Sequence, residues 1–295
     1  MRALAILAAL LALAASQANA QPDAPRPAAD ITSAPPGAPP GPAPQLAPPA
    51  ADTENAPDDA TIPIPPVPPR IAEGGQYDRC MDMLADDPAG ADALATAWRT
   101  GGEPATHCHA LAQIELGNPA AGAALLTTLA STSQSPASAR AELFGQAAQA
   151  WTMAGDPPRA MDAATHAITL APEDPDLRVT HAIAALAVHQ EAAAEEDLTD
   201  ALESDPKRAD ALVLRATARR RLGHLADAST DINLAVAQDP DNADALLERG
   251  IIRQRSGDLA GAKGDWQKVE ELSPDTAAGD LAQQNLALLD AGPNR

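Results

Sequence analysis

The sequence predicts an all-helical chain in which helical hairpins stack into a repeat array. Prolines recur at a fixed interval of 34 positions, and small residues recur in register with them. Each interval also holds two apolar stretches with the roughly 3.6-residue spacing of a helix face. One hairpin cannot bury its own apolar face, so we expect the units to stack on one another. The prolines that set the interval are Pro172, Pro206, Pro240 and Pro274.

Aligning the chain on these prolines gives four units. Their ranges are 141–174, 175–208, 209–242 and 243–276. Two corresponding places hold alanine or glycine in every unit, and a small side chain there lets two helix backbones approach closely. The first place is Ala148, Ala182, Ala216 and Gly250, and the second is Ala160, Ala194, Ala228 and Ala262. In three units a glycine separates the two helices, as expected for a helix C-cap; these are Gly155, Gly223 and Gly257.

Together these features resemble the tetratricopeptide repeat over residues 141–276. Large apolar residues in the first helices fit the family pattern, namely Phe144, Trp151, Leu212 and Leu246. Other places depart from it, namely Arg178, Ala185, Arg219 and Arg253. The resemblance implies a right-handed superhelical solenoid of helical hairpins. It also implies a concave face, lined by the first helix of each unit, that binds a peptide or protein.

Less regular helical sequence flanks the array on both sides. Residues 74–136 read as an irregular N-terminal helical region, within which 104–130 resembles a degenerate repeat unit. Four extra residues around 131–136 interrupt the period. Residues 277–291 alternate leucines with polar side chains, as expected of a terminal helix that caps an array with one polar face.

The first twenty residues have the form of a cleaved signal peptide. A short positive start precedes an apolar run, Ala3–Ala15, which is too short to span a bilayer comfortably. Ala18-Asn19-Ala20 then gives the small-x-small pattern of a cleavage site after Ala20. The alternative is an uncleaved anchor helix. No cysteine follows the run, which argues against a lipid anchor, so we expect export to a bacterial periplasm.

A Pro/Ala-rich segment, residues 21–73, separates the signal from the helical region. It contains 17 prolines between Gln21 and Arg70. Such a composition cannot bury enough apolar surface to offset chain entropy, so we expect a disordered linker with polyproline-II character. It is interpreted as a spacer, and the alternative is a ligand for a proline-recognising groove.

Composition excludes some partners. The formal net charge is −21, which argues against nucleic acid and anionic membrane surfaces. No stretch after the signal is apolar enough for a transmembrane helix. Aromatic residues make up only 2% of the chain, so the core has to consist of Ala, Leu, Ile and Val.

The two cysteines, Cys80 and Cys108, are expected to form a disulfide, because an even pair in an exported protein most simply does so. A redox pair would favour C-x-x-C spacing, which is absent. A metal site at His107-Cys108-His109 would need adjacent helical residues to face one ion. The histidines and acids form no recognisable catalytic motif, so we expect no cofactor, metal or enzymatic activity.

Arginines form a ladder within the array. Arg215, Arg219 and Arg221 recur one interval later as Arg249, Arg253 and Arg255. Asp231 and Asp265 follow Arg215 and Arg249 by 16 positions, which places each aspartate on the second helix of the same hairpin. Burying an unpaired guanidinium is costly, so we expect internal Arg215–Asp231 and Arg249–Asp265 pairs.

The expected partner-binding groove is apolar with a basic edge. Arg220, Arg221 and Arg255 are interpreted as the freer cations, suited to carboxylate-bearing partners. The alternative for the aliphatic members is plain packing between repeats. The groove residues are Val179, Ile183, Leu186, Val213, Leu214, Thr217, Arg220, Arg221, Leu247, Glu248, Ile251, Gln254 and Arg255.

These patterns favour a non-catalytic periplasmic scaffold or assembly factor that grips a peptide or protein segment, acidic in character, on its concave face. The alternative is a binding module for peptidoglycan, against which the scarcity of aromatic residues and the acidic charge both weigh. An enzyme would need convergent titratable groups that the sequence does not present. Neither the partner's identity nor the oligomeric state follows from these patterns.

Overall fold

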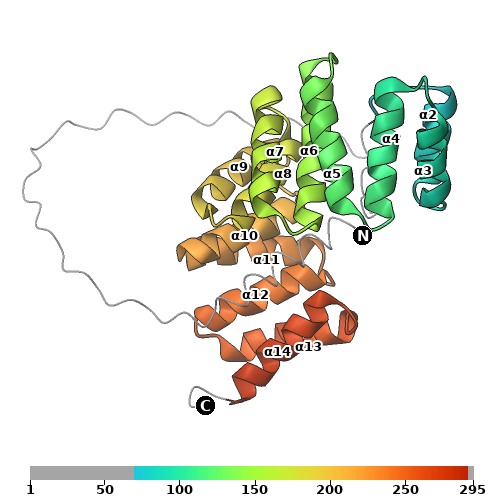
Figure 1. Cartoon of the computed structure of the whole chain (residues 1–295). Coiled ribbons are helices and arrows are strands. Elements are labelled where there is room, and N and C mark those ends of the chain that lie inside the picture. Colours follow the sequence, from blue (N-terminus) through green and yellow to red (C-terminus); the bar gives the residue numbers. More distant parts are fainter. Residues whose placement is uncertain (1–69, 292–295) are drawn as a thin grey trace, which may run out of the picture. The chain divides into compact units, whose positions relative to one another are not determined.

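The computed structural model describes residues 70–291, which form thirteen helices and no strand within that range (Figure 1). The expected signal peptide and the proline-rich segment as far as residue 69 lie outside the described residues. No helix between residues 70 and 291 combines the length and hydropathy needed to cross a bilayer. The helices are α2 (Gly75–Met83), α3 (Pro88–Ala97), α4 (Gly102–Glu115), α5 (Pro119–Thr132), α6 (Ala137–Met153), α7 (Pro157–Leu170), α8 (Pro175–Ala187), α9 (Glu191–Ser204), α10 (Ala209–Leu222), α11 (Leu225–Gln238), α12 (Ala243–Arg255), α13 (Leu259–Leu272) and α14 (Ala277–Ala291).

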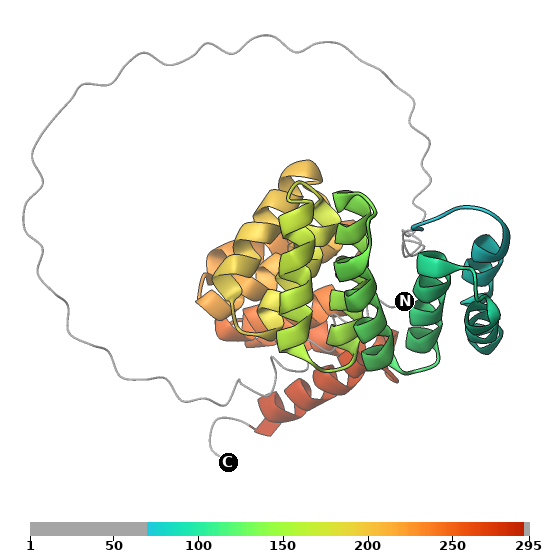
Figure 2. The same ribbon diagram turned by 45° about the horizontal axis from the view of Figure 1, so that its top comes forward.

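The helices stack in chain order as a solenoid of hairpins (Figure 2). Each helix from α2 to α14 packs against the next one along the chain. In addition, α6 contacts α8, α8 contacts α10, and α10 contacts α12. The first helices of successive hairpins therefore lie side by side, as the repeat period predicts.

Local sequence explains where the helices begin and end. Proline occupies the first turn of α3, α5, α7 and α8, where its missing N–H costs nothing. Aspartate side chains accept hydrogen bonds from backbone N–H groups at the starts of α3, α7, α8 and α13. Gly223 ends α10 in the left-handed conformation, with φ of 86°. His189 takes the corresponding place after α8 with φ of 60°, a conformation that costs a non-glycine residue energy.

In the last hairpin, side chains that face each other across the two helices have complementary sizes. In the last unit Gly250 faces Trp266, and a methyl group at position 250 would overlap the indole ring. The third unit has Ala216 with Ile232 at the same places. A larger partner on the second helix thus requires a smaller one on the first.

The N-terminal end of the described chain is already attached to α2. Arg70 forms ion pairs with Asp78 (2.8 Å) and Asp82 (3.0 Å) on that helix. The Ile71 N–H donates to Tyr77 Oη at 3.1 Å. The linker expected up to residue 73 therefore gives way to ordered contacts at residue 70.

The four residues that interrupt the period are taken up by a longer α6. α5 continues to Thr132, and α6 begins at Ala137, before the expected start of the first unit. α6 is consequently 17 residues long, against 13 or 14 for the other first helices, α8, α10 and α12. The extra sequence lengthens α6 and leaves the stacking order unchanged.

Candidate functional site

The residues of the expected groove lie on the three adjacent first helices α8, α10 and α12, in a region called here the first-helix face. Most of them are buried and belong to the hydrophobic cluster that runs from Val179 to Ala282, or to the polar contacts within it. The buried members are Val179, Leu186, Val213, Leu214, Thr217, Arg220, Leu247 and Glu248. Ile183, Arg221, Ile251 and Gln254 are partly exposed, and Arg255 is exposed. The accessible part of the expected groove is therefore small.

The predicted internal arginine–aspartate pairs are confirmed. Arg215 donates to both carboxylate oxygens of Asp231, at 2.9 and 2.8 Å. Arg249 does the same with Asp265, at 3.0 and 2.6 Å. Each pair joins the two helices of one hairpin. Because the geometry is bidentate and both aspartates are buried, these arginines serve the fold.

A second arginine reinforces each pair. Arg219 Nη1 lies 2.8 Å from Asp231, and Arg253 Nη1 lies 2.7 Å from Asp265. Arg219 also donates to Glu195 at 2.8 Å, which ties α10 to the preceding hairpin. The departures from the family pattern at these two places therefore have a structural use.

The second unit builds the same contact from different residues. His181 Nδ1 lies 2.5 Å from Asp197, at the places that Arg215 and Asp231 occupy one unit later. Arg178 adds an ion pair to Asp200 at 2.7 Å. His181 therefore has a structural partner, and it does not form a ligand set with His189.

The expectation that Arg220 is free is wrong. Its Nε donates to Glu248 at 2.5 Å and its Nη2 donates to the same carboxylate at 3.2 Å. Both residues are buried, with exposed fractions of 4% and 0%. The pair joins α10 to α12, so Arg220 holds consecutive units together.

Arg221 and Arg255 are also engaged, in this case with backbone. Arg221 Nη1 donates to the Leu186 carbonyl at 2.8 Å, and Arg255 Nη1 donates to the Arg220 carbonyl at 3.2 Å. Each acceptor lies in the last turn of the preceding first helix, where carbonyls lack partners within the helix. Burial lowers the pKa of both guanidinium groups, and the charge of Arg220 lowers it further.

An acidic row that sequence reasoning missed runs along the first helices α6, α8, α10 and α12 at the repeat period. Its members are Glu142, Asp176, Asp210 and Asp244. Arg208 joins two of them, with Nη1 at 2.5 Å from Asp176 and Nε at 2.9 Å from Asp210. Burial raises the pKa of Glu142, and the neighbouring charges of Asp174 and Asp176 raise it further. The period itself was the signal that could have revealed this row.

Asp244 differs from the rest of the row. It is 5% exposed, and within the described chain no hydrogen bond or ion pair reaches its carboxylate. Asn242 occupies the place that Arg208 has one unit earlier, and it accepts from the Ala245 N–H instead. Burial raises the pKa of Asp244 to about 6.

The cysteines lie together in the N-terminal helices, as predicted. Cys80 on α2 and Cys108 on α4 are at disulfide-bonding distance, with their Cα atoms 6.3 Å apart. His107, beside Cys108 in sequence, is completely buried and accepts from the Tyr77 hydroxyl at 2.8 Å. His109 faces elsewhere and pairs with Asp92 at 2.6 Å. Among residues 70–291 no three potential metal ligands converge.

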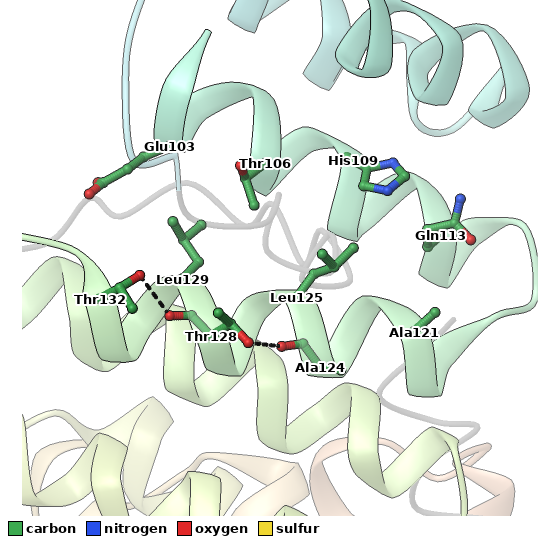
Figure 3. A pocket seen from close by; sticks show the side chains of 10 residues that line it. All are labelled: Glu103, Thr106, His109, Gln113, Ala121, Ala124, Leu125, Thr128, Leu129 and Thr132. Carbon is green, nitrogen blue, oxygen red and sulfur yellow. Dashed lines mark hydrogen bonds between the residues drawn. The ribbon is translucent and has the colours of Figure 1, made fainter. Parts of the chain in front are cut away.

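A separate hollow lies between α4 and α5 and is called here the α4–α5 slot (Figure 3). It has a volume of about 790 Å³. α4 contributes a mainly polar row, and α5 contributes alanines, leucines and threonines that face it. The lining residues are Glu103, Thr106, His109, Gln113, Ala121, Ala124, Leu125, Thr128, Leu129 and Thr132. No pattern in the sequence indicated this slot.

Comparisons with known proteins bear on the fold. No family model matches the chain, and no curated protein matches it. A tetratricopeptide repeat protein from Parabacteroides merdae is similar in structure, with a TM-score of 0.62 at 17% identity over 74% of this chain and 88% of that one.

Two further solved structures are similar. A thermophilic tetratricopeptide repeat protein of Thermus thermophilus matches with a TM-score of 0.52 at 17% identity, over 65% of this chain and 100% of its own. A chain of the APC/C hetero-tetramer Cut9–Hcn1 matches with 0.59 at 15% identity, over 72% of this chain and 42% of its own. The chain therefore has the tetratricopeptide repeat fold.

Proposed function

We propose that this protein is an exported, non-catalytic scaffold that binds a segment of a partner protein along its first-helix face. The observation that carries the proposal is the continuity of that face. Side chains one repeat period apart lie beside one another on the first helices of successive hairpins. Asp176 on α8 and Asp210 on α10 are close enough for Arg208 to bridge them. Such a surface suits an extended or helical segment. In a compared structure the same fold occurs in a hetero-tetramer, that of Cut9 and Hcn1.

The charge of the partner is the finer part of the proposal. The arginines that indicated an acidic partner are engaged with Glu248 or with backbone carbonyls. Asp176 and Asp210 share a single cation, Arg208, and their side chains are 76% and 46% exposed. We therefore favour a partner segment with basic side chains over an acidic one.

In-cell crosslinking of the mature chain, residues 21–295, tests the proposal. One dominant crosslinked partner is expected, and the double variant Asp176→Lys/Asp210→Lys should lose it. The matched control is Glu203→Lys, an exposed charge reversal on the second helix α9. Retention of the partner by the double variant would reject the first-helix face. Recovery of wall fragments alone would favour the peptidoglycan-binding alternative.

Export is a separate part of the proposal. The apolar start with its Ala18-Asn19-Ala20 site and the bonded distance of Cys80 and Cys108 support it. Intact-mass analysis of the periplasmic fraction should find a chain that begins at Gln21. A chain retaining residue 1 in the cytoplasmic fraction, with both thiols free, would contradict export.

A further inference from the structure

The α4–α5 slot lies outside the repeat period and shares no residue with the first-helix face. In Figure 3 the side chains of Leu125 and Leu129 rise from α5 toward α4, opposite Thr106 and His109. Its volume falls in the range of roughly 300–1,000 Å³ that is usual for ligand pockets. The slot therefore has room for several apolar side chains of a bound molecule.

The floor of the slot is aliphatic. Leu125 is partly exposed, and Ala121 and Ala124 are exposed on the same side of α5. These residues recur at three- and four-residue spacing, so they form one stripe along the helix. The hairpin leaves this apolar stripe uncovered, so binding of an apolar partner over it is favourable.

The polar groups around the floor mainly present acceptors. The Thr106, Thr128 and Thr132 hydroxyls donate to carbonyls of their own helices, at 3.1, 2.8 and 2.9 Å. These hydroxyl protons are already engaged, so toward a ligand the hydroxyl oxygens can only accept hydrogen bonds. The Gln113 amide N–H likewise donates to Asp92 at 2.9 Å. A ligand that fits this edge supplies N–H donors.

Two carboxylates near the slot favour a cation. Glu103 lines one end, held by the hydroxyls of Ser133 (2.9 Å) and Ser135 (3.3 Å) on its Oε2. Asp92 stands behind His109 toward the other end. Among residues 70–291 no lysine or arginine lines the slot.

We propose that the α4–α5 slot binds a short segment of a partner protein that carries aliphatic side chains and one lysine or arginine, with the cation placed against Glu103. The polar row runs from Glu103 to Gln113 on α4, which at 1.5 Å per residue is about 15 Å. That length accommodates about five residues of extended chain. The net charge of −21 also favours encounter with a basic segment.

The test is a differential selection from a library of random eight-residue peptides, with the mature chain as bait. Ala124→Arg serves as the blocked variant, because a long side chain at this exposed position fills the slot without disturbing the core. Peptides retained by the wild type and lost with Ala124→Arg should combine aliphatic residues with lysine or arginine. Circular dichroism checks that the variant is folded. Absence of any such peptide, or selection of acidic ones, overturns the proposal.

The role of Glu103 is tested on one selected peptide by fluorescence anisotropy. Glu103→Gln keeps an oxygen for the two serines and removes the charge, so affinity should fall about fivefold, as expected of a partly exposed ion pair. A version of the peptide with glutamine in place of its cation should bind both proteins equally. Equal affinity of the cationic peptide for both proteins would overturn the pairing.

Two controls separate this site from the others. Ile251→Glu, on the first-helix face, should leave binding of the selected peptide unchanged, and loss of binding would reassign the peptide to that face. A synthetic peptide of residues 61–70 has aliphatic side chains and Arg70, but five of its ten residues are prolines, which supply no N–H donor to the acceptor-lined edge. It should therefore not compete for the slot. Competition by that peptide would identify the chain's own proline-rich segment as the occupant and overturn binding of a partner.

Discussion

At the residue scale, a buried polar chain joins Ile71 and the N-terminal helices α2 and α4 to α6, the first helix of the array. The Ile71 N–H donates to Tyr77 Oη, the Tyr77 hydroxyl donates to His107 Nδ1 at 2.8 Å, and His107 Nε2–H donates to Gln146 Oε1 at 2.7 Å. This sequence of donors requires a neutral imidazole with its proton on Nε2. Burial lowers the pKa of His107 to about 4, although the Gln146 hydrogen bond opposes the shift.

His107 should make the protein acid-sensitive in a defined window. Its folded-state pKa lies below the unfolded value of about 6.5, so its contribution is complete above pH 6.5 and is lost as the pH falls toward 4. The expected loss is about 2 kcal/mol at pH 5. Urea unfolding at pH 7 and 5 measures it, and His107→Gln should reduce the difference by that amount. His109→Gln is the matched control, and an unchanged pH dependence in His107→Gln would contradict the assignment.

The effect of Asp244 on stability has the opposite pH dependence to that of His107. Its folded-state pKa is raised to about 6, above the unfolded value of about 3.9, so its unfavourable contribution is present at neutral pH and disappears as the pH falls below 4. Asp244→Asn should therefore stabilise the protein at pH 7.5 by about 2–3 kcal/mol, with no gain near pH 3.5. Asp210→Asn, at the equivalent exposed place, is the control; it weakens only an exposed ion pair with Arg208, so stability should change by less than about 1 kcal/mol. Equal effects of the two substitutions would show that burial of Asp244 is not the cause.

At the element scale, the pairing of Gly250 with Trp266 sets the spacing of α12 and α13. Gly250→Ala should cost about 1–3 kcal/mol, because the added methyl group overlaps the buried indole. The double variant Gly250→Ala/Trp266→Ile installs the pair that the third unit already uses, Ala216 with Ile232. This double variant should recover most of the stability that Gly250→Ala loses. Chemical denaturation measures both, and a double variant no better than the single one would refute the compensation.

The element scale also shows why only some site contacts could be predicted. Arg215–Asp231 and Arg249–Asp265 were predictable because both partners recur at the same period within one hairpin. The Arg220–Glu248 pair joins different units, and the third unit has Leu214 where the fourth has Glu248. No repeated pattern therefore indicated it.

Contacts to backbone were equally hidden from sequence. The Arg221 and Arg255 guanidinium groups donate to backbone carbonyls of the preceding first helix. Every residue has a backbone carbonyl, so the amino-acid sequence does not indicate which one is the acceptor. The α4–α5 slot lies in the irregular region, where no period fixes the register of one helix against the next. Sequence reasoning thus predicted the repeat architecture well, and predicted least where contacts cross between units.

At the scale of the whole molecule, the buried apolar residues of the described range 70–291 form two clusters that meet in the second unit. One runs from Tyr77 to Ala184, and the other runs from Val179 to Ala282. In a solenoid each unit contacts only its neighbours, so stability is roughly a sum of local terms. A perturbation at one end should therefore weaken that end more than the other.

The Cys80–Cys108 pair tests this locality. The bond spans a separation of 28 residues, and by the loop-entropy relation its removal should cost about 3–4 kcal/mol. Hydrogen exchange of the oxidised chain and of Cys80→Ser/Cys108→Ser should show faster exchange in α2–α5 and unchanged protection in α10–α13. Reduction of the wild type should reproduce that pattern. Uniform loss of protection along the chain would mean that the two clusters unfold as one cooperative unit, because local opening would then cost as much as global unfolding.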